Sequence, residues 1–234
     1  MSLAVHELRT PVTVVSGYLQ MLLREQGGPL NEKQRKMLEE ADRSCTRIGT
    51  LVSEMSDLGR LEGGDLKLSG PEFDLSALIA ELATGMPEGE DRGIRLETRG
   101  IDRPVMVSGD RTRLAAALRA LMHAALRDRA DPGVIIAECS TSTISNQSWA
   151  VVAIGAEPVA RSLADAAASI PAFDEWRGGL GLALPVGRRV IEAHGGAVWS
   201  APGNAPRAGS ALRLPLAKKQ DSSVRIPGVP EIHR

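Results

Sequence analysis

The chain has 234 residues, 43% of them hydrophobic and 24% charged, which is enough for one ordinary globular domain and a smaller module. A formal net charge of −1 excludes a global field that would attract nucleic acid or an anionic membrane surface. Cys45 and Cys139 are far apart without metal-ligand spacing, and predict small buried side chains in a reducing compartment. Without an apolar run of membrane-spanning length or a signal peptide, the sequence predicts a soluble, cytoplasmic chain that makes no membrane contact.

The first predicted element is a helix that ends near Arg24, before a Gly-Gly-Pro sequence. Apolar residues at alternating spacings of four and three form a seam along it, namely Leu8, Val12, Val15, Leu19 and Leu22. Leu8 lies about 200° around the helix from His6, at ~100° per residue. We therefore expect the imidazole to face outward and the seam to pack inward.

His6, Glu7 and Thr10 place an imidazole, a carboxylate and a hydroxyl within two helical turns. A neutral imidazole nitrogen can attack phosphorus, and an adjacent carboxylate can orient or accept the other ring proton. The alternative is that His6 is an ordinary surface residue, as a lone exposed histidine usually is. The combination of the three side chains predicts phosphoryl transfer and not metal binding.

A second helix is predicted from Glu32, with Asn31 as its N-cap, to the glycine pair at 63–64. It has its own seam of apolar or small residues: Met37, Ala41, Ser44, Ile48, Leu51, Met55 and Leu58. The two helices predict an all-α hairpin over residues 1–64. Because a lone hairpin has too little core, we expect two copies to pair into a four-helix bundle, as a homodimer. In the alternative, the second seam packs on the C-terminal domain of the same chain.

The pattern of residues 65–217 predicts an α/β domain, and the polar composition of residues 218–234 predicts a disordered tail. Helices are expected after Asp74, after Asp110 and up to Ala193, and strands near residues 94–98, 105–107, 134–139, 149–154, 198 and 211–216. Residues 157–169 fit either helix or loop. The run Gly178-Gly179-Leu180-Gly181-Leu182 at a helix start can present backbone N–H groups to phosphates, or can be a tight strand-to-helix turn.

The hexapeptide His6-Glu7-Leu8-Arg9-Thr10-Pro11 resembles the phospho-acceptor box of two-component sensor histidine kinases. The order of the later elements resembles the ATP-binding domain of the same family. The resemblance implies that His6 is phosphorylated, that Glu7 is its base, and that Thr10 positions water in a phosphatase reaction. It implies a helical hairpin followed by a two-layer α/β sandwich of the histidine kinase ATPase type. It also implies ATP and Mg²⁺ as cofactors and a response regulator receiver domain as partner.

The predicted nucleotide site departs from the family pattern at several positions, of which two matter most. Ala124 stands where the family has an asparagine that holds Mg²⁺, and Ile154 stands where an aspartate receives the adenine amino group. An alanine methyl cannot coordinate a hard cation, which needs oxygen ligands. We therefore assign no metal ligand, and the candidate cofactor contacts are Arg127 and residues 178–182. His123, beside Ala124, is predicted to be packed and not to replace the missing ligand.

Three functions remain open from the sequence. The first is a sensor kinase core that phosphorylates His6 from ATP and passes the phosphoryl group to an aspartate of a response regulator. The second is an ATP-independent phosphotransferase or phosphatase, and the third is a non-enzymatic dimeric scaffold that regulates another kinase. We predict a histidine kinase-like signalling protein that carries phosphate on His6, with impaired autophosphorylation. Because only five residues precede His6, we also expect a sensor part, which could be membrane-bound, in a longer protein.

Overall fold

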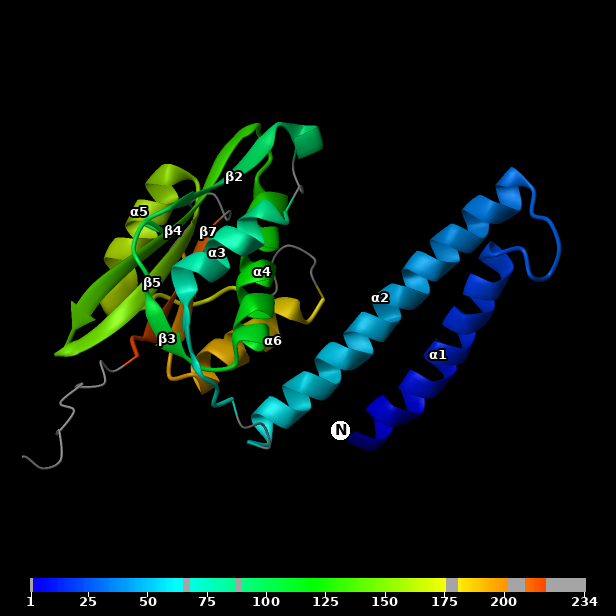
Figure 1. Ribbon diagram of the computed structural model, residues 1–234, viewed down its shortest axis with the longest axis horizontal. Helices are drawn as coiled ribbons and strands as arrows, with labels where there is room; N and C mark the ends of the chain where they lie inside the picture. The colour runs from blue at the N-terminus through cyan, green and yellow to red at the C-terminus, as the bar shows by residue number, and fades with distance from the viewer. Residues whose placement is uncertain (1, 65–67, 87–89, 176–180, 202–208, 218–234) are drawn as a thin grey trace, which may run out of the picture.

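The structure is a computed structural model that describes residues 2–64, 68–86, 90–175, 181–201 and 209–217. A long helical hairpin lies beside an α/β domain, and the two touch along the C-terminal half of the second helix (Figure 1). This arrangement confirms the predicted fold class. Among the described helices, none combines the length and the apolarity needed to cross a membrane. The tail predicted at residues 218–234 lies outside the described residues.

The hairpin consists of α1 (Ser2–Leu23) and α2 (Glu32–Glu62). Asn31 caps α2 as predicted: the Gln34 N–H donates to Asn31 Oδ1 over 2.9 Å, and the Asn31 N–H donates to Gln34 Oε1 over 3.0 Å. This reciprocal pair is a capping box, which satisfies two backbone donors at the start of the helix. The cap fixes where the chain reverses and sends α2 back along α1.

In the single chain, the α1 seam that was expected to pack inward is only partly covered. Val12 and Leu19 are half-buried, but Leu8, Val15 and Leu22 are 47%, 51% and 39% exposed. The reason is that α2 covers a side of α1 that is rotated away from the centre of the seam. The buried or half-buried residues of α1 include Val5, Ser16 and Leu23, which lie to one side of the seam. One edge of the apolar face of the hairpin is therefore left uncovered in the single chain.

The α/β domain is built on a five-stranded mixed sheet in the order β2-β4-β5-β7-β6. Its strands are β2 (Ile94–Arg99), β4 (Gly133–Ile144), β5 (Gln147–Gly155), β6 (Ala197–Ser200) and β7 (Gly209–Pro215). Only the β2–β4 pair is parallel. Two short strands, β1 (Glu72–Asp74) and β3 (Met106–Ser108), pair with each other outside this sheet.

Three helices cover one face of the sheet: α3 (Leu75–Thr84), α4 (Arg111–Asp128) and α6 (Ala183–Ala193). Asp74 and Asp110 cap α3 and α4 as predicted, each accepting a backbone N–H of the first turn. A short 3-10 turn, Glu90–Arg92, precedes β2. The main core lies between these helices and the sheet.

The segment that fitted either helix or loop forms α5 (Glu157–Asp165) and a 3-10 turn (Ala166–Ala168) on the other face of the sheet (Figure 1). Side chains alternate between faces along a strand. In β5, Val152 and Ile154 accordingly belong to the main core, while Val151 and Ala153 pack in a second cluster with α5. This small extra layer was not assigned from the sequence.

Both cysteines are buried, as predicted. Burial raises the pKa of the Cys139 thiol to about 11, although the Ser76 hydroxyl donates a hydrogen bond to its sulfur. Only the thiolate form of a cysteine is nucleophilic. Because the pKa is about two units above the usual value of 9, the thiolate fraction of Cys139 at neutral pH is roughly a hundredfold smaller than that of an ordinary cysteine. We expect iodoacetamide to modify Cys139 at least about 100-fold more slowly in the native protein than in urea, measured by mass spectrometry. Equal rates in the two conditions would contradict the burial of this thiol.

Candidate functional site

The candidate acceptor segment lies on the outer side of α1. His6, Glu7 and Thr10 are all exposed, whereas Val5 beside them is only 4% exposed and packs inward. His6 is therefore anchored by a buried neighbour while its ring faces solvent, in the orientation that the helical period predicted. An imidazole held this way is accessible to a docking protein.

The level of His6 along the hairpin follows from contacts of Val12. The Cys45 thiol donates to the Val12 carbonyl over 3.4 Å, and a side chain at Gly49 would meet Val12 Cγ1 at 3.7 Å. In a pair of antiparallel helices, one residue toward the N-terminus of the first helix corresponds to about one residue toward the C-terminus of the second, because both rise by the same distance per residue. His6 is therefore level with the part of α2 around Ser53 and Glu54. That part of α2 is where the α/β domain touches the hairpin.

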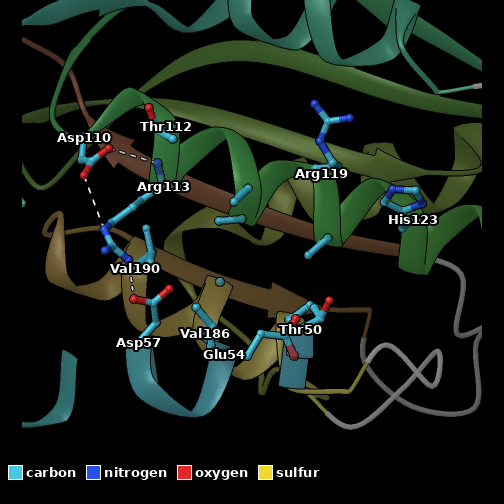
Figure 2. Close-up of a pocket in the computed structure, with 15 residues that line it drawn as sticks. Thr50, Glu54, Asp57, Asp110, Thr112, Arg113, Arg119, His123, Val186 and Val190 are labelled. Carbon is cyan, nitrogen blue, oxygen red and sulfur yellow. Dashed lines mark hydrogen bonds and ion pairs between the residues drawn. The ribbon is translucent and has the colours of Figure 1, made fainter. Parts of the chain in front are cut away.

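A cleft of about 830 Å³ lies between the two modules (Figure 2). Helix α2 contributes polar side chains to its wall, α4 contributes alanines together with polar side chains, and α6 contributes small and apolar residues. The residues drawn from the three helices include Thr50, Glu54, Asp57, Arg113, Ala117, Arg119, His123, Val186 and Val190. His123 is half-buried in this wall, on a helix turn next to the core.

Two polar contacts close the cleft. The Leu182 N–H, at the start of α6, donates to Glu54 Oε2 over 3.1 Å. Asp57 Oδ1 lies 3.2 Å from Arg113 Nη1, and Arg113 Nε lies 3.5 Å from Asp110 Oδ2. Burial raises the pKa of the Glu54 carboxyl, and the Leu182 hydrogen bond opposes that rise. The carboxylate is thus held at a helix N-terminus at some desolvation cost.

These contacts between the modules were not predicted from the sequence. One feature of the sequence is consistent with these contacts: successive spacings of four, three and four residues place on one face of α2 the side chains of Thr50, Glu54, Asp57 and Leu61. A polar face on a helix ordinarily indicates exposure to solvent. The sequence suggested a contact between α2 and the C-terminal domain only as an alternative, through the apolar seam of α2 and not through this polar face.

The positions predicted to depart from the nucleotide-binding pattern are both in the core. Ala124 and Ile154 are 0% exposed and belong to the main apolar cluster. Ser210 lies opposite Ile154 in the β5–β7 register, and its buried hydroxyl has no hydrogen-bond partner among the described residues. The part of the chain that the structure describes also lacks a group of three or more His, Cys, Asp or Glu side chains able to hold a metal ion. Both positions therefore present apolar side chains to the core of the α/β domain.

The remaining candidate cofactor residues are only partly described. Gly178, Gly179 and Leu180 lie outside the described residues. Gly181 has a φ of +65°, a conformation that favours glycine, and Leu182 follows it as the N-cap of α6. Arg127 is exposed near the end of α4. The structure brings Gly181 and Leu182 against α2 and leaves Arg127 open to solvent.

The helical hairpin is similar to a known protein family. Residues 1–64 match the family model of the His Kinase A (phospho-acceptor) domain. The hairpin is therefore similar to a phospho-acceptor domain. It carries His6 on the exposed side of its first helix, with the α/β domain next in the chain.

Relatives of the whole chain are sensor proteins. The chain is 25% identical to the sensor protein GacS of Pseudomonas syringae pv. syringae, over 95% of this chain and 26% of that protein. It is also 25% identical to the sensor protein DivL of Caulobacter vibrioides, over 95% and 28% of the two chains. The chain therefore spans about a quarter of the length of these relatives, and it is histidine kinase-like from the phospho-acceptor domain onward.

Solved structures share the fold. Full-length ShkA in complex with AMPPNP aligns with a TM-score of 0.70 at 23% identity, covering 92% of this chain and 45% of that one. The Acinetobacter baumannii histidine kinase AdeS aligns with a TM-score of 0.54 at 18% identity, covering 91% and 98%. Both likenesses concern the fold alone.

Proposed function

We propose that the chain is a two-component phosphotransfer protein in which His6 exchanges a phosphoryl group with an aspartate of a response regulator receiver domain. The observation that carries this proposal is the exposed His6, with Glu7 and Thr10 beside it, in a matched phospho-acceptor domain. In this division of labour, residues 1–64 carry the phosphate and form the homodimer. Residues 65–217 serve for docking and regulation.

Phosphoryl transfer between the receiver and His6 requires that the receiver can reach the imidazole and that the reacting groups are correctly oriented. A nitrogen of the neutral His6 ring attacks the phosphorus of the aspartyl phosphate, the acyl phosphate P–O bond breaks, and the receiver carboxylate leaves. Glu7 accepts the proton from the other ring nitrogen, which stabilises the charge that develops on the ring. Thr10, one helical turn from His6, orients water when the phosphate is lost by hydrolysis.

Autophosphorylation from ATP is impaired in this proposal. Ala124 cannot supply an oxygen ligand, and Ile154 cannot accept a hydrogen bond from an adenine amino group. Loss of one hydrogen bond to a charged group costs about 1.5–3 kcal/mol, or roughly 10- to 150-fold in affinity. ATP and Mg²⁺ binding, which the family implies and which the AMPPNP in the ShkA structure illustrates for that protein, is therefore weak here.

A second candidate is ATP-driven autophosphorylation. The start of α6 favours it, because Gly181 has a φ of +65° and the N-terminus of a helix can present backbone N–H groups to phosphate. Arg127 is also exposed and free to approach a phosphate. The source of phosphate on His6 distinguishes this candidate from the first.

The purified chain should therefore acquire acid-labile phosphate from a phosphorylated receiver, and at least about tenfold less from Mg·ATP in the same time. Phosphate-affinity gels with receivers charged by acetyl phosphate measure the first reaction, and radiolabelled ATP measures the second. The matched variant Ala124→Asn with Ile154→Asp restores both oxygen groups, and we expect its ATP affinity to exceed that of the unchanged chain. Rapid labelling of the unchanged chain by ATP would support the second candidate, and labelling from neither donor would contradict both.

A further inference from the structure

Small side chains leave the cleft between α2, α4 and α6 open. Helices α4 and α6 pack closely, since a side chain at Gly187 would meet the Cα atom of Ala117 at 3.3 Å. On either side of this contact the two helices line the cleft with short apolar residues: Ala116, Ala120, Ala183, Val186 and Val190. Because these side chains are short, a volume of about 830 Å³ remains between them and α2.

The size and the lining of the cleft are those of a site for a small organic molecule. Such sites usually have volumes of about 300–1,000 Å³, mostly apolar walls and a few polar groups that orient the ligand. Here the apolar surface comes from α4 and α6, and α2 supplies polar groups on the opposite wall (Figure 2). A ligand in the cleft therefore meets an apolar surface on one side and polar groups on the other.

The charges of the cleft favour a cation. Three carboxylates line it, from Glu54, Asp57 and Asp110, together with the guanidinium groups of Arg113 and Arg119. Arg113 lies 3.2 Å from one carboxylate, that of Asp57, and 3.5 Å from the other, that of Asp110. Arg119 is exposed and extends from α4 away from Glu54 and Asp57 (Figure 2). Negative charge therefore exceeds positive charge on the side of the cleft that faces α2.

Glu54 is the carboxylate best placed to receive this cation. The Leu182 N–H uses one acceptor position of Glu54 Oε2, and a carboxylate offers about four such positions. Burial raises the pKa of the Glu54 carboxyl, which reflects the loss of water around its charge. An ammonium group beside it offsets that loss. One helical turn earlier, the Thr50 hydroxyl donates to the Thr46 carbonyl over 3.1 Å, and its oxygen still accepts hydrogen bonds.

We propose that the cleft binds a small organic cation, namely a primary amine with an apolar body. The ammonium group pairs with Glu54, and the apolar body lies on the alanine and valine side chains of α4 and α6. An anion of the same size binds more weakly, because Asp57 and Asp110 already engage the Arg113 guanidinium. The site requires no phosphate on His6, so it does not depend on the function proposed above.

Three probes of one shape test the proposal: phenylbutylamine, phenylbutanol and phenylbutanoate, each with its polar group at the end of the chain. Dissociation constants come from NMR titrations of the full chain. We expect the amine to bind at least about tenfold more tightly than the alcohol, because it adds a hydrogen bond between charged groups. The anion should bind more weakly than the alcohol. Equal affinities for the amine and the alcohol, or tightest binding of the anion, would overturn the choice of a cation.

The Glu54→Gln chain tests the role of the carboxylate. Its amide oxygen still accepts the Leu182 N–H, so the start of α6 keeps its contact while the charge is removed. This chain should bind the amine and the alcohol with equal affinity. Glu40→Gln makes the same change on an exposed part of α2 and should keep the preference for the amine. A preference retained in Glu54→Gln would show that Glu54 does not bind the cation.

The Ala116→Leu chain tests the location of the site. Ala116 is exposed and lines the cleft, so a leucine fills part of the open volume without entering the core. Binding of the amine and the alcohol should weaken at least about tenfold, while thermal unfolding without probe stays unchanged. Ala168→Leu, at an exposed position on the other face of the sheet, is the matched control and should bind both as the unchanged chain does. Unchanged binding in Ala116→Leu would place the amine outside the cleft and overturn the proposal.

Discussion

A His6→Gln chain should take up no phosphate from a phosphorylated receiver under conditions in which the unchanged chain is labelled to completion. Glutamine keeps a polar side chain of moderate size, but its amide nitrogen is not a nucleophile toward phosphorus. His6 is exposed on α1, so the substitution should change the free energy of unfolding by no more than about 0.5 kcal/mol. Phosphate-affinity gels measure the uptake, and thermal unfolding checks the fold.

The control for this experiment is His123→Gln. His123 is half-buried on α4 and lines the cleft, away from the exposed side of α1. This chain should be labelled as the unchanged one is, and its label should be lost in acid and kept in alkali, as expected of phosphohistidine. Label that persists in His6→Gln would place the acceptor elsewhere and remove the main support for phosphotransfer.

Local signals in the sequence were sufficient for much of the fold. The helices that follow Asn31, Asp74 and Asp110 begin where predicted, because an N-cap side chain satisfies backbone groups within three residues of itself. The outward direction of His6 was equally predictable, since it depends only on the helical period and on one apolar face. Features of this kind need no knowledge of distant neighbours.

Features that depend on a neighbouring element were not predictable in the same way. The period of the α1 seam does not reveal which edge of it α2 covers, so Val15 was expected inside and is exposed. A polar contact such as Glu54 with the Leu182 N–H joins residues 128 positions apart and has no sequence pattern. The burial of Ala124 and Ile154, by contrast, agrees with their apolar character, which was the reason for doubting a nucleotide site there.

The uncovered edge of the hairpin supports the homodimer. A groove of about 400 Å³ runs between α1 and α2, lined by Pro11, Val12, Val15, Leu19, Ala41, Ser44, Cys45 and Ile48. Around it, Leu8, Val15, Leu22, Met37 and Ile48 are 39% to 65% exposed. We propose that the same groove of a second copy covers it, because two such hairpins complete a four-helix bundle. His6 lies about 180° around α1 from Val15, so this pairing leaves the acceptor accessible.

A Val15→Glu, Ile48→Glu chain should accordingly be a monomer. The two changes remove four apolar side chains from the interface of a symmetric dimer and place charges there. At about 1.5 kcal/mol for each lost side chain, the dimer is weakened by roughly 6 kcal/mol, or about 10⁴-fold in dissociation constant. Sedimentation velocity measures the change, and the helix content should persist because Val5, Cys45 and Val52 still pack within the hairpin.

The matched control is Thr13→Glu with Thr46→Glu, which adds the same charge to the same two helices. Thr13 lies about 160° around α1 from Val15, and Thr46 about 160° around α2 from Ile48, so both changes fall opposite the groove. Both residues are exposed in the single chain. This control should remain dimeric. If it dissociates as readily as the groove variant, charge alone drives the effect; if the groove variant stays dimeric, the second copy binds a different face of the hairpin.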